Sequence, residues 1–167
     1  FLRFNKRGSI REVRHYKNDT LHGKRLKYNA QGKIMERSVY KNGKLNGTKE
    51  QFYSNGKSQT RIDYTAGKKN GFAIWYYRNG NMSAKYEYHM NSIENEAKFY
   101  YEEGAVRAIY EYENNLRDGS FKDFYKEGTL KTEGRYKEGK NHGTWTYYNT
   151  DGKVEKTVEY RRGELKS

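Results

Sequence analysis

A period of 24 residues runs through the whole chain and constrains its fold more than any other feature. Tyrosine recurs seven times at this spacing, at Tyr16, Tyr40, Tyr64, Tyr88, Tyr112, Tyr136 and Tyr160. Glycine recurs seven times at the same spacing, at Gly8, Gly32, Gly56, Gly80, Gly104, Gly128 and Gly152. No insertion separates the units. We expect such a chain to fold as a row of similar units, each packed on its neighbours.

Two further columns of the repeat mark backbone positions with positive φ. The first column is Gly23, Gly47, Gly71, Asn95, Gly119 and Gly143. The second is Asp19, Gly43, Gly67, Asn91, Asn115, Gly139 and Gly163. Every exception to glycine is Asn or Asp, which tolerate positive φ better than other side chains do. Both columns are therefore predicted to have left-handed backbone.

Each unit has the pattern of a β-hairpin. In the third unit, residues 47–53 are the predicted first strand, 54–56 the turn and 57–64 the returning strand. Six residues around Gly67 are expected to lead to the next hairpin. Apolar and polar residues alternate along the returning strand, and no stretch shows the period of a helix. The pattern predicts antiparallel strands throughout.

The turn determines which residues share a face of the sheet. A loop that ends in glycine favours a three-residue form with a G1 bulge. This form would place Phe52 on the same face as Ser58 and Tyr64, whereas a two-residue Asn-Gly turn would reverse that assignment. We prefer the bulge, because it gathers the most regular columns on one face.

The composition requires an unusual core. Leu, Ile, Val and Phe supply only 25 of 167 residues, and by composition alone the chain would be classed as disordered. Its 18 tyrosines and its lack of proline argue against disorder. The rings of the tyrosine column are expected to stack across strands in place of an aliphatic core.

The predicted fold is therefore all-β, an elongated single-layer antiparallel sheet of about seven successive β-hairpin repeats. It forms one repeat domain over residues 1–167. The predicted units lie near residues 1–22, 23–46, 47–70, 71–94, 95–118, 119–142 and 143–167. The chain is expected to begin within a repeat.

Three segments resemble the core of a MORN repeat: Tyr40-Lys-Asn-Gly-Lys-Leu-Asn-Gly47, Tyr64-Thr-Ala-Gly-Lys-Lys-Asn-Gly71 and Tyr136-Lys-Glu-Gly-Lys-Asn-His-Gly-Thr-Trp145. The 24-residue period and the pair Tyr76-Tyr77 before Asn79-Gly80 are similar to the bacterial variant of that family. The resemblance implies a sheet of successive hairpins that acts as a protein-interaction scaffold, and some members have been proposed to bind acidic phospholipids. Relatives labelled as antitoxins or exported repeat proteins imply those roles as well.

No residue pattern points to catalysis, and we expect no enzyme activity, cofactor or metal. The chain has no cysteine and only four histidines. His22 and His142 precede column glycines and are interpreted as turn residues, and His15 and His89 lack the spacing of metal ligands. No nucleophile elbow, Walker loop or dinucleotide-binding glycine motif is present. A single-layer sheet also lacks the water-excluding cleft that acid–base catalysis needs.

A second aromatic column is the predicted partner-binding surface. It consists of Tyr53, Tyr77, Tyr101 and Tyr125, and the parity of the strands places Trp75 and Phe99 on the same side. Arg37, Arg61 and Lys85 are expected there too. Aromatic side chains rimmed by cations are typical of binding surfaces. The alternative is that both faces of a thin sheet need aromatic residues for stability.

The positive charge lies in the first part of the chain. Residues 1–70 have a net charge of +13 and residues 71–167 a net charge of zero. Such a field attracts anionic partners, and the predicted anionic-surface residues are Lys24, Arg25, Lys27, Lys33 and Lys57. The alternative is that edge lysines keep strands from pairing between molecules. Nucleic acid is not an expected partner, because no reader motif is present.

The expected function is that of a non-catalytic scaffold that binds a protein partner through the aromatic and basic face. One alternative is peripheral binding to an anionic surface, an acidic phospholipid or a polysaccharide, through the basic N-terminal repeats. Another is an antitoxin-like neutralising protein. Open sheet edges would permit end-to-end self-association. We expect a bacterial protein at an exported or cell-surface location, or in the cytoplasm if it is antitoxin-like.

Overall fold

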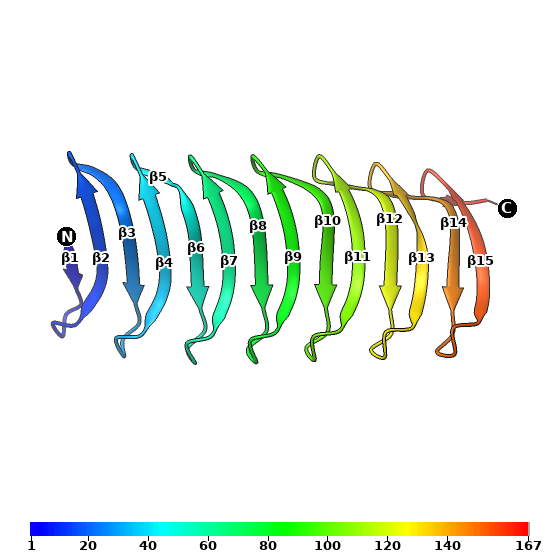
Figure 1. The fold of residues 1–167 in the computed structure, drawn as a ribbon, viewed down its shortest axis with the longest axis horizontal. Helices are drawn as coiled ribbons and strands as arrows, with labels where there is room; N and C mark the ends of the chain where they lie inside the picture. Colours follow the sequence, from blue (N-terminus) through cyan, green and yellow to red (C-terminus); the bar gives the residue numbers. More distant parts are fainter. Residues whose placement is uncertain (167) are drawn as a thin grey trace. The chain divides into compact units, whose positions relative to one another are not determined.

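The computed structural model describes residues 1–166, and every regular element in that range is a β-strand (Figure 1). The strands are β1 (Leu2–Phe4), β2 (Ile10–Lys17), β3 (Thr20–Tyr28), β4 (Ile34–Lys41), β5 (Lys44–Leu45), β6 (Gly47–Phe52), β7 (Ser58–Thr65), β8 (Lys68–Tyr76), β9 (Met82–His89), β10 (Ser92–Tyr100), β11 (Val106–Glu113), β12 (Leu116–Phe124), β13 (Leu130–Lys137), β14 (Lys140–Tyr148), β15 (Val154–Arg161) and β16 (Glu164–Leu165).

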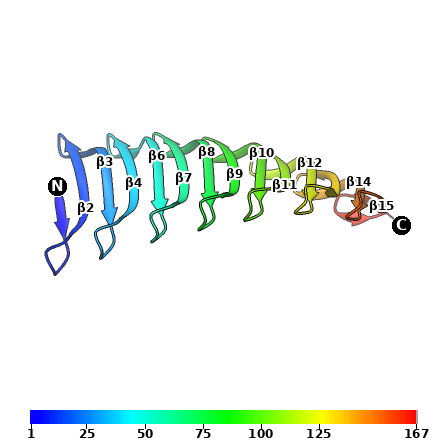
Figure 2. The ribbon, with the colours of Figure 1, turned by 60° about the horizontal axis from the view of Figure 1, so that its bottom comes forward.

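The chain forms two compact units. Unit 1 comprises residues 1–81 and 88–91, and unit 2 comprises residues 82–87 and those from Ser92 onward, so β9 is divided between them. In unit 1 the strand order is β1-β2-β3-β4-β6-β7-β8, with β5 paired to β4, and in unit 2 strands β10 to β16 follow chain order. The pairings are antiparallel. Figure 2 shows the strands of unit 1, from blue to green, as a single layer. The predicted fold class of hairpins in an antiparallel sheet is confirmed.

The glycine-terminated loops have the predicted form. In unit 1, the Gly56 N–H donates to the Tyr53 carbonyl at 2.9 Å, and the Tyr53 N–H donates to the Lys57 carbonyl at 2.8 Å. Gly56 has a φ of 85°. This pair of bonds is that of a type I turn followed by a G1 bulge. The same two bonds recur in the loops that begin at Asn5, Asn29, Tyr77, Tyr101, Tyr125 and Asn149.

The prediction of which side chains share a face is wrong for the returning strands. One residue of such a strand has no partner on the neighbouring strand. Gln51 lies opposite Thr60 and Phe52 opposite Ser58, so Gln59 has no partner. An unpaired residue reverses the side on which its neighbours lie. Phe52 therefore shares a face with Ser58 as predicted, but this is not the face of Thr60.

The residues around Phe52 confirm this correction. Tyr64 lies on the face of Thr60, four residues further along β7, because side chains alternate. The Arg37 guanidinium instead lies 5.5 Å from the Phe52 ring centroid, and Arg37 pairs with Glu50. We call the side of the Tyr64 column the tyrosine face, and the side of Arg37 and Phe52 the opposite face.

The predicted six-residue connection around Gly67 is also wrong. Strand β7 continues to Thr65 and β8 begins at Lys68, so the connection is a two-residue turn. Ala66 and Gly67 have φ values of 49° and 86°, as a type I′ turn requires. The Gly67 N–H donates to the Leu45 carbonyl of the preceding repeat at 2.7 Å, which links successive hairpins at this edge.

Positive φ at the first glycine column is confirmed, and it arises from a bulge. Ile62 lies opposite Ala73 and Tyr64 opposite Lys69, so three residues of β8 centred on Gly71 face one residue of β7. Gly71 has a φ of 106°. Asn95, the exception in this column, has a φ of 61°.

The tyrosine face is the packed face, and its character differs between the units. In unit 2, Ala108, Phe121 and Trp145 are 4–8% exposed and form an aromatic cluster with Phe99, Tyr110, Tyr136, Tyr147, Val158 and Tyr160. The Tyr136 and Tyr160 rings lie 5.2 and 6.0 Å from the Trp145 ring, which confirms that column tyrosines pack across strands. In unit 1 the same face buries polar side chains, namely Glu12, Glu36, Ser38 and Thr60.

Candidate functional site

The second aromatic column lies in the G1-bulge loops and links one repeat to the next. The hydroxyls of Tyr53 and Tyr101 donate to the carbonyls of Tyr76 and Phe124, 23 residues further along, both at 2.7 Å. Tyr125 makes the equivalent bond to Tyr148 at 2.9 Å, and Tyr77 starts the corresponding loop of unit 1. These half-buried rings thus contribute to stability, which was the alternative interpretation of the column.

Asparagine replaces tyrosine in this column in three loops, and there it closes its own loop. The Asn29 side-chain oxygen accepts from the backbone N–H groups of Gln31 and Lys33 at 3.0 and 2.9 Å. Asn5 makes the same pair of bonds. The hydrogen bonds of these asparagines therefore stay within one repeat.

Replacing Tyr101 by Phe should lower the free energy of unfolding by about 0.5–1.5 kcal/mol, because the Phe124 carbonyl loses its side-chain donor. Urea unfolding followed by circular dichroism measures this loss. Tyr64→Phe is the matched control, since no hydrogen bond of its hydroxyl is found within residues 1–166. Equal losses in the two variants would contradict the linking role.

The predicted aromatic and basic surface is not assembled. Trp75 lies opposite Thr60 on the tyrosine face of unit 1, and the Phe99 ring lies 5.5 Å from that of Tyr110 on the tyrosine face of unit 2. Arg37 and Arg61 lie on the opposite face of unit 1, where each pairs with Glu50. The unpaired bulge residue of each hairpin is the cause of the misplacement.

Lys85 also lies apart from the aromatic residues with which it was grouped. It precedes Tyr86, whose ring lies 5.5 Å from that of Phe99 on the tyrosine face of unit 2. Side chains of successive strand residues point to opposite faces, so Lys85 lies on the opposite face.

The five predicted anionic-surface residues divide among three places. Arg25 and Lys27 lie on the tyrosine face, opposite Ser38 and Glu36, and Lys24 lies on the other face. Lys33 and Lys57 belong to the loops, where the Lys57 ammonium donates to the Asn79 carbonyl. Only Arg25 and Lys27 therefore belong to the concave site described next.

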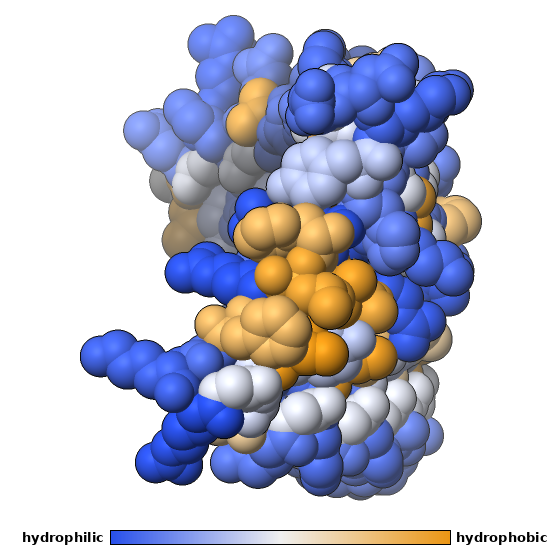
Figure 3. Space-filling model, turned by 90° about the vertical axis from the view of Figure 1, so that its left-hand side faces the viewer, coloured by the Kyte–Doolittle hydropathy of each residue, from blue (hydrophilic) through white to orange (hydrophobic). Residues whose placement is uncertain are grey.

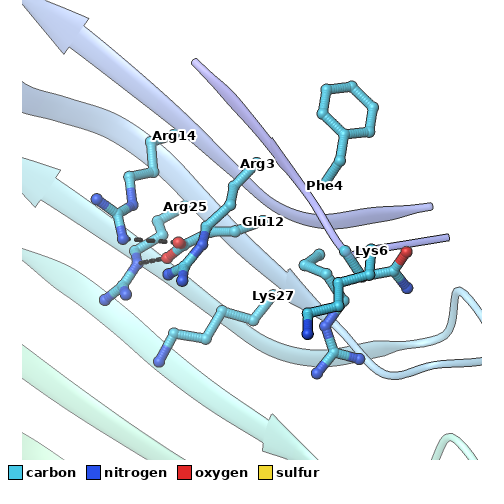
Figure 4. A pocket seen from close by; sticks show the side chains of 9 residues that line it. Arg3, Phe4, Lys6, Glu12, Arg14, Arg25 and Lys27 are labelled. Carbon is cyan, nitrogen blue, oxygen red and sulfur yellow. Dashed lines mark hydrogen bonds and ion pairs between the residues drawn. The ribbon is translucent and has the colours of Figure 1, made fainter. Parts of the chain in front are cut away.

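A basic pocket of about 590 Å³ lies on unit 1, over β1, β2 and β3 and the loop that begins at Asn5 (Figure 4). Six cationic side chains line it, together with one carboxylate, that of Glu12. The cations are Arg3, Lys6, Arg11, Arg14, Arg25 and Lys27. Strand register brings them together, since Glu12 lies between Arg3 on β1 and Lys27 on β3.

Glu12 is at the centre of the ion pairs in the pocket. Its side chain is 6% exposed, and its two oxygens lie 2.6 Å from Arg14 Nη2 and 2.6 Å from Arg25 Nε. Arg25 Nη1 also donates to the Tyr40 hydroxyl at 3.2 Å. Figure 4 shows both guanidinium groups directed to the carboxylate, with the Arg3 and Lys27 side chains beside them.

The pocket's charges shift the pKa values of its residues. Burial alone would raise the pKa of Glu12, but the hydrogen bonds from Arg14 and Arg25 outweigh burial and hold that pKa below its ordinary value of 4.5. The hydrogen bond to Glu12 raises the pKa of Arg14. For Arg25, burial lowers the pKa, and the bonds to Glu12 and Tyr40 raise it by more.

Glu12 should make the stability of the chain depend on acid pH. A carboxyl whose pKa is lower in the folded state stabilises the fold above pH 4.5, and this stabilisation is lost as the pH falls through the folded pKa. The melting temperature is therefore expected to fall more steeply below pH 4.5 in the unmodified chain than in Glu12→Gln. Parallel curves for the two proteins would contradict this role.

Sequence reasoning missed Arg3, Lys6, Arg11, Arg14 and Glu12 as members of one site. Two signals were available. Glu12 and Arg14 are two residues apart in one predicted strand, and Arg3 and Lys27 occupy the same column of the repeat. Both signals place these pairs on one face.

Apolar side chains are exposed on the other side of the sheet from the pocket. Leu2, Phe4 and Ile10 are 49%, 53% and 39% exposed. Figure 3 views unit 1 from the end that carries β1 and shows hydrophobic side chains gathered between hydrophilic ones. Phe4 points away from the cations in Figure 4. Leu2 and Phe4 flank Arg3 in β1 and Ile10 pairs with Phe4, so these apolar side chains lie on the opposite face of unit 1.

Within residues 1–166, no group of three or more His, Asp or Glu side chains is arranged to hold a metal ion. The same range contains no helix with the length and apolar character to span a membrane.

The comparisons with known proteins concern the repeat. The family model described as MORN repeat variant matches residues 21–42, 69–90, 93–114, 117–138 and 141–162. None of the curated proteins matches the chain. A similar solved chain is that of a mutant of S. aureus TarM in complex with fondaparinux, alpha-GlcNAc-glycerol and UDP, at 8% identity and a TM-score of 0.41. The similarity covers 65% of this chain and 21% of that one, and at this TM-score it supports no conclusion.

Proposed function

This chain belongs to the MORN repeat family, in its variant form, and from that premise we propose that unit 1 attaches the protein to an anionic phospholipid surface. MORN repeats commonly serve as binding or scaffold modules, including modules that bind membrane lipids. The family is non-enzymatic. The observation that carries the proposal is the basic pocket, in which six cations surround a single carboxylate.

The charges of the loops support the same surface. The four G1-bulge loops of unit 1 contain Lys6, Arg7, Lys33, Lys57 and Arg78 and no acidic residue. The three equivalent loops of unit 2 contain Glu102, Glu103, Glu127 and Asp151 against two lysines. A cation near an anionic membrane contributes about 1 kcal/mol of attraction. Unit 1 is therefore the end that an anionic surface attracts.

The exposed apolar side chains favour a lipid over a soluble polyanion. Leu2 and Phe4 flank Arg3 in β1, the edge strand of unit 1, so they point to the face opposite the pocket. A membrane that meets this edge contacts both faces, and apolar side chains near cations suit the boundary between headgroups and acyl chains. A polysaccharide or DNA offers charge but no acyl region.

Vesicle co-sedimentation tests the proposal. The chain should bind vesicles that contain phosphatidylglycerol at about 50 mM salt and lose most of that binding at about 300 mM. It should not bind phosphatidylcholine vesicles at either concentration. Equal binding of soluble hyaluronate and DNA would overturn the preference for lipid.

Two double variants with the same change in net charge test whether vesicle binding depends on the cations of unit 1 or only on the total charge of the chain. Arg7→Glu with Lys33→Glu changes two loops of unit 1, and Lys126→Glu with Lys153→Glu changes two equivalent loops of unit 2. Both pairs alter the net charge equally. The first pair should weaken vesicle binding at least about tenfold and the second pair far less. Equal effects would contradict attachment through unit 1.

A protein partner is the second candidate. It is supported by the opposite face of unit 1, where Ile74 lies across from Arg61 and the nearby Phe72 is 43% exposed. Apolar and Arg side chains of this kind are enriched in protein interfaces. Partner binding that persists at about 300 mM salt, is lost in Phe72→Ala and is unaffected by the Arg7 and Lys33 substitutions would favour this candidate.

A further inference from the structure

We propose that the pocket of unit 1 is a built site for a phosphate group with two negative charges, and that Glu12 positions Arg14 and Arg25 to bind it. The proposal rests on the proposed function and deepens it. A phosphate monoester is the ligand chemistry, whether it is the headgroup of a lipid or a soluble molecule.

The pocket has donors that the protein itself does not use. Within residues 1–166, Arg3, Lys6 and Arg11 make no ion pair. Arg14 Nε is buried and has no hydrogen-bond partner in that range. A ligand with several acceptor oxygens would pair with Arg3, Lys6 and Arg11, which line the pocket.

The excess of positive charge in the pocket favours a ligand with two negative charges. The side chains that line the roughly 590 Å³ include six cations and one carboxylate, and Lys27 also pairs with Glu36 at 3.3 Å, so the pocket keeps a strong excess of positive charge. Concave sites of one charge sign concentrate the field and attract small counter-ions. The guanidinium groups of Arg3 and Arg11 present parallel N–H groups that match two phosphate oxygens, and Arg14 and Arg25 add positive charge beside them.

Glu12 organises the site although its own charge opposes the ligand. Arg14 and Arg25 lie opposite each other on β2 and β3, and without a carboxylate between them their guanidinium groups would repel one another. Glu12 binds one nitrogen of each at 2.6 Å and thereby orients both. Glu12 is thus a positioning residue, and its loss would release both arginines.

The positioning role of Glu12 and a general attraction between charges predict opposite effects of Glu12→Gln on binding. Glu12→Gln raises the net charge of the chain by one. A surface that attracts anions by charge alone would then bind more tightly, whereas a built pocket would bind its ligand less tightly. Glu50→Gln is the control, because it raises the charge equally but lies on the opposite face of unit 1, paired with Arg37 at 3.6 Å.

The experiment compares two vesicles of equal surface charge. Phosphatidic acid carries a phosphate monoester and phosphatidylglycerol a phosphodiester, so only the former presents the proposed ligand. Glycerol 3-phosphate in solution, measured by isothermal titration calorimetry, tests the soluble source. The unmodified chain should bind phosphatidic acid at least about tenfold more tightly than phosphatidylglycerol, and glycerol 3-phosphate should compete.

The variants give the decisive readout. Glu12→Gln should lose the preference for phosphatidic acid while its binding to phosphatidylglycerol stays equal or rises, and Glu50→Gln should keep the preference. Arg3→Gln breaks no ion pair, so we expect it to keep the fold. It should lose the preference too, whereas Lys41→Gln, an exposed cation of unit 1 outside the pocket, should not.

The outcomes distinguish the failure of the pocket from the failure of membrane attachment. Equal binding to both vesicles, unchanged or tighter in Glu12→Gln, would overturn the pocket and leave membrane attachment standing. Binding of glycerol 3-phosphate without binding to any vesicle would overturn membrane attachment and support the pocket for a soluble ligand. Binding to neither vesicles nor glycerol 3-phosphate would overturn both.

Discussion

Replacing Trp145 by Ala should lower the free energy of unfolding by about 3–5 kcal/mol. Trp145 is 4% exposed, and its ring lies 5.2 Å from the rings of both Phe121 and Tyr136. Its indole N–H also donates to the Arg135 carbonyl at 3.2 Å. The substitution would leave a cavity at the centre of the aromatic cluster, which a single-layer sheet has few side chains to fill. Urea unfolding followed by far-ultraviolet circular dichroism measures the loss.

The same substitution at the other tryptophan is the control. Trp75 lies on the tyrosine face of unit 1 but is only half-buried. Trp75→Ala should therefore cost clearly less than Trp145→Ala. Equal costs would show that the stability of the sheet does not depend on the cluster around Trp145.

Replacing Gly119 by Ala should destabilise the chain by about 2–4 kcal/mol, for two reasons that add. Gly119 has a φ of 114°, a conformation that L side chains rarely adopt. A Cβ atom there would lie 2.8 Å from Glu111 Cβ and 2.1 Å from a Glu111 carboxylate oxygen. That oxygen accepts from the Ser120 N–H at 2.5 Å, so the new methyl group would also disturb this bond. Thermal unfolding measures the effect.

Gly128→Ala is the control that separates the cost of the positive φ from the cost of the steric contact with Glu111. Gly128 has a φ of 89°, and a Cβ atom there would meet nothing within 4 Å. Only the backbone cost should remain, about 1–2 kcal/mol. If Gly119→Ala cost no more than Gly128→Ala, the close approach of Glu111 would have no energetic consequence.

The two units share one backbone pattern, but the same column of the repeat makes different contacts in each. The column that contains Phe121 and Trp145 in unit 2 contains Arg25 and Lys49 in unit 1. In unit 2 these positions fill an aromatic cluster, and in unit 1 they make ion pairs with Glu12 and Glu36. Buried ion pairs stabilise a fold less than well-packed apolar side chains do. We infer that unit 1 has a less well packed tyrosine face than unit 2 because its proposed binding role requires charged side chains there.

Turn chemistry is the part of the fold that the sequence determined by itself. Gly56 and its equivalents predicted the bulged loops, and the Asn, Asp and Gly columns predicted positive φ, because such preferences act within a few residues. Because the 24-residue period runs through the whole chain, the hairpin predicted for one unit applied to the others as well. The short connection at Gly67 was missed because Ala66, a residue that rarely has positive φ, occupies its first position.

Only the tertiary structure decided which side chains share a face. Gln59 and its equivalents Arg11, Met35, Arg107, Lys131 and Glu155 have no common chemistry, so no sequence pattern marks the unpaired residue. Yet this one residue places Trp75 on the other face from Arg37 and Arg61 in unit 1, and Phe99 on the other face from Lys85 in unit 2. The pocket around Glu12 likewise depends on the register of three strands and a loop. Local preferences act within a turn, whereas a shared face depends on how whole strands pair.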